Sequence, residues 1–378
     1  MSTEKNDVTD SEFSDSLVGE TTEIEDIPKD ERVLRTQAYD KSVADLVAMI
    51  KQDEIVLTPE YQRSYVWDDT RASLLVESVL LNVPIPVVYV AEEDDGRWTV
   101  VDGLQRLNSL ARFLNNEFEL RGLEVLPELN KSRFHQLNPK ASRILKNGII
   151  RVILIFKESH PEIKYEIFMR LNRGAITLTE QELRNCLYRG AFNSLLHELR
   201  ADESVKTMFR RDSIHKRMGD AELILRSLMV MEGFDPATGS VPTYSGNMKS
   251  SLNRFMRSKQ HAKPEVIDKM RSDFLCCVDK ILTVFGDDAL QRVDEAGDYD
   301  GRLNRALMEA FMASFLRFDR DILVKHKKEI RKKLVSILLN DEGFTDSITV
   351  RTSEAKKMDR RVSGVFTLVS DVVNTVSR

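Results

Sequence analysis

Five consecutive residues, Asp102-Gly103-Leu104-Gln105-Arg106, combine a carboxylate, a glycine and a guanidinium where a short apolar strand should give way to a helix. A glycine allows a tight turn and a close approach of the backbone. The first turn of the following helix offers unpaired amide N–H groups and a partial positive charge. Arg106, one turn into that helix, adds a second positive group. Together these features predict an anion site, and phosphate is the usual anion in such sites.

A purely structural interpretation of the same stretch is equally simple. Asp102 would cap the helix, Arg106 would lie in solvent, and the segment would be an ordinary strand–turn–helix corner. The local pattern alone slightly favours this structural interpretation, so the decision depends on the rest of the chain.

A second segment with unusual chemistry lies upstream, where Tyr61, Tyr65 and Trp67 surround Gln62 and Arg63. Loops with such side chains often line sites, and the rings could stack on a nucleotide base or on a flipped base. Aromatic packing beneath a surface arginine is the alternative, and it is the commoner role.

Short strands and helices must position both segments. Apolar periodicity and turn signals predict helices at 43–50, at 69–82 and from residue 104 onward, with strands or extended segments at 55–59, 87–90, 98–101 and 149–156. Beyond residue 160 the pattern is helical throughout, and a capping box joins Thr179 to Glu182 at the start of one helix.

The chain therefore divides into three parts. Residues 1–33 are predicted to be an acidic, disordered tail, because they hold too few apolar groups to offset the entropy of ordering. Residues 34–160 are predicted to form an α+β domain, and residues 161–378 an all-helical domain.

The charge of the chain is uneven. The 378 residues carry a net charge of −5, but residues 1–30 alone contribute −8, so the remainder is about +3. Nucleic-acid binding is therefore not excluded. The sequence has no apolar run of the roughly 20 residues that span a bilayer and no signal-peptide pattern, which predicts a cytoplasmic protein with no membrane contact. The three cysteines show no metal-ligand spacing.

Basic clusters supply candidate DNA contacts. The most interesting one precedes a helix and contains Arg210, Arg211, Lys216 and Arg217, with further runs at 325–333 and 356–361. Lysine and arginine bind phosphates with salt-dependent affinity. A solvated helix face is the better interpretation of any single cluster.

Several motifs follow one another in a fixed order along the first half of the chain. They are Tyr61-Gln62-Arg63 with Tyr65 and Trp67, Glu77-Ser78 before Pro84-Ile85-Pro86, Val101 to Leu107, Phe168 to Gly174, and Leu178 with Glu182-Leu183-Arg184. This set resembles the GmrSD-type restriction endonuclease N-terminal-domain family, which is marked by an Asp-Gly-Gln-Gln-Arg motif and includes GmrS and the N-terminal part of SspE. The resemblance covers about residues 40–190. It implies a ParB/sulfiredoxin-like α+β domain followed by an all-α helical domain.

The resemblance also implies roles for individual residues. In ParB-like and sulfiredoxin-like proteins a Gly-x-x-Arg turn holds nucleotide phosphates, and Gly103 to Arg106 fits that pattern, which lifts the phosphate interpretation above the structural one. The implied catalytic residues are Asp102, Gln105 and Arg106, with Mg²⁺ near Asp102. The implied nucleotide-binding residues are Gly103, Leu104, Tyr61, Gln62 and Arg63.

Leu104 departs from the family pattern, which has glutamine at this position. Leucine can neither donate nor accept a hydrogen bond, so any contact that an amide would make there is lost. If Leu104 points into the core, the change is harmless. If it faces the nucleotide, turnover is in doubt while binding can survive.

The six histidines are scattered, so we expect no His-rich nuclease module in this chain. The resemblance then implies an NTP-binding and hydrolysing sensor subunit, using Mg²⁺ with GTP or ATP, in a bacterial modification-dependent restriction system. Its implied partners are DNA, which can be modified, and a separate nuclease subunit, and a homo-oligomer is left open. The alternatives are a non-catalytic nucleotide- or DNA-binding regulatory module and a stand-alone ParB-like DNA nickase.

Overall fold

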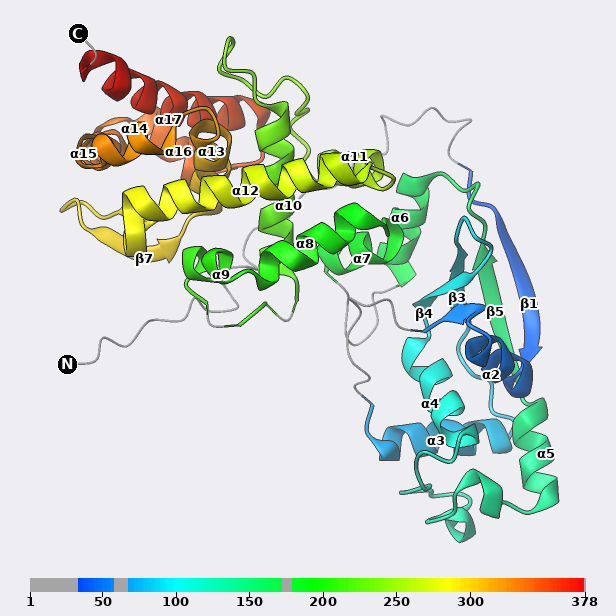
Figure 1. Cartoon of the computed structure of the whole chain (residues 1–378). Coiled ribbons are helices and arrows are strands. Elements are labelled where there is room, and N and C mark those ends of the chain that lie inside the picture. The colour runs from blue at the N-terminus through cyan, green and yellow to red at the C-terminus, as the bar shows by residue number, and fades with distance from the viewer. Residues whose placement is uncertain (1–32, 58–66, 172–178, 212, 216, 377–378) are drawn as a thin grey trace, which may run out of the picture. The chain divides into compact units, whose positions relative to one another are not determined.

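A computed structural model of the chain describes residues 33–57, 67–171, 179–211, 213–215 and 217–376 (Figure 1). The described residues divide into two compact units, one ending at Leu187 and one beginning at Tyr188. We call them the sheet unit and the helical unit and describe each by itself.

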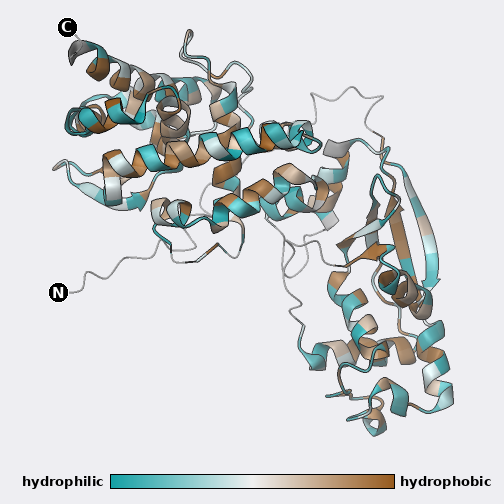
Figure 2. Ribbon diagram, in the orientation of Figure 1, coloured by the Kyte–Doolittle hydropathy of each residue, from teal (hydrophilic) through white to brown (hydrophobic). Residues whose placement is uncertain are grey.

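A mixed five-stranded sheet forms the middle of the sheet unit, in the order β1-β5-β3-β4-β2. The strands are β1 (Thr36–Ser42), β2 (Ile55–Val56), β3 (Val88–Glu92), β4 (Trp98–Asp102) and β5 (Ile149–Ile155). β3 runs parallel to β5 and antiparallel to β4, β2 runs parallel to β4, and β1 is antiparallel to β5. In Figure 2 the inner strand β5 is largely brown, whereas the edge strand β1 is mostly teal and white.

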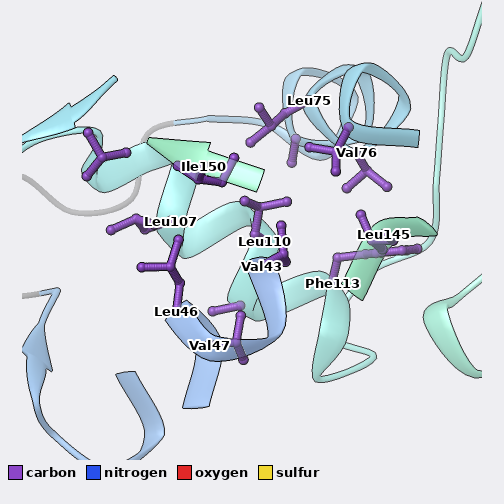
Figure 3. Close-up of a cluster of buried hydrophobic side chains, with 14 of the residues drawn as sticks. Val43, Leu46, Val47, Leu75, Val76, Leu107, Leu110, Phe113, Leu145 and Ile150 are labelled. Carbon is purple, nitrogen blue, oxygen red and sulfur yellow. The ribbon is translucent and has the colours of Figure 1, made fainter. Parts of the chain in front are cut away.

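The main core lies on one face of this sheet, beneath four helices. They are α2 (Val43–Lys51), α3 (Asp69–Leu80), α4 (Leu104–Leu114) and α5 (Pro139–Asn147). Their apolar side chains, spaced three or four residues apart, meet those of the sheet (Figure 3). Two short 3₁₀ helices, η2 (Pro127–Leu129) and η3 (Phe134–Gln136), lie in the connection between α4 and α5.

Two further helices of the sheet unit, α6 (Pro161–Leu171) and α7 (Glu180–Leu187), belong to a second, smaller core. There Tyr165, Phe168 and Leu183 pack with Ala91 and Val101 of the sheet. Alternate residues of β3 thus pack in different cores, because successive side chains of a strand point to opposite faces of the sheet. The compact sheet unit therefore includes two helices that periodicity alone groups with the helical segment.

The predicted capping box at the start of α7 is confirmed. The backbone N–H of Glu182 donates to Thr179 Oγ1 at 3.2 Å, and the backbone N–H of Thr179 donates to Glu182 Oε2 at 2.6 Å. The two side chains thus satisfy donors that would otherwise lack partners at the start of the helix.

The helical unit is built from ten helices in the part of the chain that the structure describes. They are α8 (Ala191–Ala201), α9 (Glu203–Phe209), α10 (Gly219–Gly233), α11 (Met248–Lys259), α12 (Pro264–Phe285), α13 (Arg305–Phe315), α14 (Arg320–Lys325), α15 (Lys327–Asn340), α16 (Glu342–Thr349) and α17 (Ala355–Val376). A 3₁₀ turn, η4 (Gly286–Asp288), leads into a hairpin of β6 (Gln291–Val293) and β7 (Tyr299–Leu303), which the helical pattern did not predict. The α+β class with a following helical region is confirmed.

Buried ion pairs cross the interior of the helical unit. Glu309 of α13 pairs with Arg361 of α17 and lies 3.7 Å from the guanidinium of Arg226, which also pairs with Glu222 at 2.9 Å. Such charges are tolerated inside a protein because each has a partner. Among the described residues, every helix is too short or too polar to span a lipid bilayer.

Candidate functional site

The predicted corner lies in the sheet unit, where β4 passes directly into α4. Gly103 separates the two elements and has a φ of +101°, in the left-handed region that side-chain-bearing residues rarely adopt. A Cβ atom on Gly103 would lie 2.7 Å from Val88 Cγ2 on the neighbouring strand. Glycine is therefore required here by backbone conformation and by space.

Asp102 does not cap α4. The capping position belongs to Gly103, and the Asp102 carboxylate instead accepts a 2.7 Å hydrogen bond from Arg106 Nη2. Arg106 is not in solvent either, because only 12% of its side chain is exposed, against 40% for Asp102. The structural interpretation with a capping aspartate and a solvated arginine is wrong.

Arg106 also binds the entry to β3. Its Nη1 donates to the carbonyl of Pro86 at 2.8 Å, and its Nη2 donates to the carbonyl of Val87 at 3.4 Å. One guanidinium thus joins the end of β4, the first turn of α4 and the segment before β3. We call this arrangement the Arg106 clamp.

The start of α4, beside the clamp, lacks a side-chain cap. Gly103 carries no side chain and so supplies no capping oxygen to the first N–H groups of the helix. These groups carry the positive end of the helix dipole. Because Arg106 balances the charge of Asp102, the carboxylate repels an approaching anion less than an unpaired one would.

Gln105 connects the corner to the chain that precedes α3. Its Oε1 accepts a 3.3 Å hydrogen bond from the backbone N–H of Trp67. Asp68, the next residue, caps α3 by accepting from the N–H of Arg71 at 2.8 Å. The upstream aromatic segment therefore ends beside the corner.

Part of the predicted nucleotide-binding set cannot be placed. Tyr61, Gln62 and Arg63 lie outside the described residues.

Leu104 turns toward the protein interior. Its side chain is partly buried and packs against the main core of the sheet unit. The departure from the family glutamine therefore adds an apolar contact to the core, and Leu104 contributes only its backbone at the start of α4.

Two motif residues that were given no role at the sequence level hold the scaffold together. The buried carboxylate of Glu77 accepts hydrogen bonds from the N–H groups of Val125 and Leu126, at 2.9 and 2.8 Å. The buried guanidinium of Arg184 pairs with Glu180 at 2.8 Å within α7. The Pro86 and Val87 carbonyls were also missed, because nothing in the sequence links them to an arginine twenty positions away.

The predicted DNA-contact cluster belongs to the helical unit and is partly used internally. Arg210 ends α9 and donates to the carbonyl of Gly301 at 3.0 Å. Burial lowers its pKa, and the charges of three nearby aspartates oppose this shift. His215, which lies in the same cluster, is buried and accepts at Nδ1 from the N–H groups of Arg217 and Gly219. Arg211 is half-buried, and Lys216 is outside the described residues.

A cavity of about 470 Å³ lies in the helical unit, between α10, α12 and the end of α13. It is lined by Leu228, Met231, Glu232, Glu265, Val266, Lys269, Met270, Asp273, Leu316 and Arg317. None of the predicted site residues lines it.

Comparison with known proteins bears on the sheet unit. Residues 43–189 match the family model described as GmrSD restriction endonuclease, N-terminal domain. The chain matches no curated protein and no solved structure at a significant level. The matched residues include the corner, the Arg106 clamp, and helices α2 to α7. The match covers less than half of the chain, and over residues 43–189 the sequence is similar to the GmrSD restriction endonuclease N-terminal-domain family.

Proposed function

We propose that the corner at residues 102–106 binds and hydrolyses a nucleoside triphosphate, GTP or ATP. The chain would act as the sensor subunit of a modification-dependent restriction system together with a separate nuclease. The observation that carries this proposal is the start of α4, which has no side-chain cap, beside a half-exposed carboxylate whose charge is balanced by a largely buried arginine.

Phosphate oxygens are the expected ligands at the start of α4. The N–H group of Leu104 would donate to them, as helix N-termini do in many phosphate sites. Because Gly103 packs closely on Val88, there is no room for a side chain at residue 103. A phosphate group that approaches the start of α4 therefore meets backbone at this residue. Arg106 has donors beyond those used in the clamp, since a guanidinium carries five N–H groups.

The residues present fit a magnesium ion that arrives with a nucleotide. Among the described residues no three histidine, cysteine, aspartate or glutamate side chains gather to form a metal cage. Mg²⁺ needs only one or two carboxylates when substrate phosphates and waters supply the other ligands, and Asp102 provides one. When bound, the ion would neutralise phosphate charge.

The chain's own residues supply the remaining chemistry. The Asp102 carboxylate would accept a hydrogen bond from the attacking water and orient it toward the terminal phosphate. Arg106 holds that carboxylate at 2.7 Å, and Gln105 holds the incoming chain at Trp67. The packing of Leu104 on the core supports an active enzyme, because its apolar side chain then contacts the core and not the nucleotide.

The restriction role supports a partner that cuts DNA. In this proposal, DNA cleavage is carried out by a separate subunit. DNA binding would then be coupled to nucleotide turnover, as a sensor subunit requires.

The test is nucleotide hydrolysis by the purified chain with Mg²⁺, for ATP and GTP, with and without modified DNA. We expect Asp102→Asn to lower the rate by about 100-fold or more, the usual contribution of a positioned base. Arg106→Lys should fail to restore the activity lost in Arg106→Ala, because lysine lacks the fork that reaches three oxygens.

The matched control is Arg97→Ala, at the opposite end of β4. Arg97 also pairs with an aspartate, Asp95, at 2.7 Å, but it lies away from the corner and is about half exposed. Its loss should leave hydrolysis unchanged. Wild-type turnover in Asp102→Asn would overturn the site assignment. Nucleotide binding without phosphate release in the wild type would favour the non-catalytic module, and plasmid nicking by this chain alone would favour the nickase.

A further inference from the structure

We propose that the outer face of α5 contacts the phosphate backbone of duplex DNA. Three exposed cations, Lys140, Arg143 and Lys146, lie on this helix of the sheet unit. The sequence of α5, Pro-Lys-Ala-Ser-Arg-Ile-Leu-Lys-Asn, contains no acidic residue. The inference rests on the restriction role of the family and not on nucleotide hydrolysis.

Helix geometry places the three cations along one side of α5. A spacing of three residues advances about 4.5 Å along the axis and turns each side chain about 60° from the previous one. The set therefore spans about 9 Å and about 120° of the helix surface. The opposite side carries Leu145, which is fully buried against the main core. α5 packs on α2 and α3, so its orientation is fixed by the core.

The three cations have no carboxylate partner among the described residues. Arg143 Nε donates to the carbonyl of Pro139 at 3.4 Å, and Lys146 Nζ lies 5.4 Å from the ring centre of Phe134. These contacts orient the side chains without neutralising them. Their full charge therefore faces solvent, as an electrostatic contact to a polyanion requires.

Two exposed arginines elsewhere in the sheet unit are engaged with acids. Arg97 pairs with Asp95, and Arg151 pairs with Asp40 at 2.8 Å.

The basic runs of the helical unit are also partly compensated. Lys333 pairs with Asp371 at 3.2 Å, Lys357 pairs with Asp346 at 2.6 Å, and Arg361 is buried against Glu309. A dense run of basic residues in the sequence therefore carries less uncompensated positive charge than its composition indicates. The α5 face is less conspicuous in the sequence but is fully uncompensated, and it lies within the residues that match the restriction family.

The test is the salt dependence of DNA binding by the full chain, measured by fluorescence anisotropy with a labelled linear duplex. Each phosphate contact contributes about 0.9 to the slope of log K against log salt. The triple variant K140A/R143A/K146A should therefore reduce the magnitude of this slope by about 2.7. Alanine is the best helix former, so the exposed substitutions should leave the fold intact.

The control variant K327A/K328A/K332A removes the same charge from exposed positions of α15. It should leave the slope unchanged. Equal slopes for the wild type and the α5 variant, or an equal loss in both triple variants, would overturn the proposal, as would a wild-type chain that does not bind DNA. Nucleotide hydrolysis without DNA should be normal in the α5 variant, so failure of this inference is distinguishable from failure of the proposed function.

Discussion

Replacing Gly103 with alanine tests whether backbone conformation and lack of space both require glycine at the corner. The left-handed backbone costs an alanine about 1–2 kcal/mol. The new Cβ would lie 2.7 Å from Val88 Cγ2, and overpacking of this kind costs about 1–3 kcal/mol. Alanine also restricts the unfolded chain, which offsets about 0.4–1 kcal/mol. We therefore expect Gly103→Ala to destabilise the sheet unit by about 1–5 kcal/mol.

The two tryptophans of the chain make this measurement specific. Trp67 and Trp98 both pack partly buried against the main core of the sheet unit. Tryptophan fluorescence during urea unfolding of the full chain therefore follows the sheet unit. Gly96→Ala is the matched control, because Gly96 also has a positive φ, +85°, but open space around it. It should cost about 1 kcal/mol, from backbone conformation alone.

A double-mutant cycle separates the steric part. In Val88→Ala the methyl groups that meet the new Cβ are removed, so the cost of Gly103→Ala should fall by about 1–3 kcal/mol in that background. The reasoning is refuted if Gly103→Ala costs no more than Gly96→Ala, or if the effects of the Gly103 and Val88 substitutions simply add.

Three further predictions concern the helical unit. Asp220→Ala should destabilise the helical unit by about 3–5 kcal/mol, because the guanidinium of Arg200, which is 5% exposed, loses the carboxylate that lies 2.9 Å from it. Urea unfolding followed by circular dichroism measures this change, and a loss of stability below about 1 kcal/mol would contradict the prediction. Burial, and secondarily the charge of Arg200, lower the pKa of His197 from 6.5 to about 3. The unfolded chain then binds a proton that the folded chain does not, so stability falls as the pH drops from 6.5 toward 3. His197→Gln should show a shallower fall in its urea midpoint between pH 7 and 4.5, and parallel curves would refute it. Burial raises the pKa of Cys277 to about 12, so a maleimide at pH 7.5 should label exposed Cys276 and leave Cys277 unmodified in the native protein, as checked by peptide mass mapping.

Local patterns in the sequence predicted most of the elements that surround the corner. The helices predicted at 43–50 and 69–82 are α2 and α3, and the strand predicted at 149–156 is β5. These segments have strong apolar periodicity, and the apolar side chains that produce this pattern are the ones that form the core. The capping box at Thr179 is equally local, since its two side chains lie three positions apart.

Features that depend on distant partners were not predictable. β1, Thr-Gln-Ala-Tyr-Asp-Lys-Ser, has little apolar alternation and forms a strand because β5 pairs with it. The β6–β7 hairpin is short and largely polar. The Arg106 clamp depends on two carbonyls from another strand entry, so the sequence indicated an anion site but not what holds its carboxylate.

The position of β5 in the sheet constrains how this unit can form during synthesis. β5 is the last of the five strands to be made, yet it lies between β1 and β3. Ser42 pairs with Ile149, which is synthesised more than a hundred residues later. At a synthesis rate of about 5–20 residues per second, the delay is roughly 5–20 s. During that time β1 has no partner, and an apolar strand would be exposed to pairing with other chains. The polar composition of β1 made this strand hard to predict. The same composition protects the nascent chain from pairing with other chains until β5 has been synthesised.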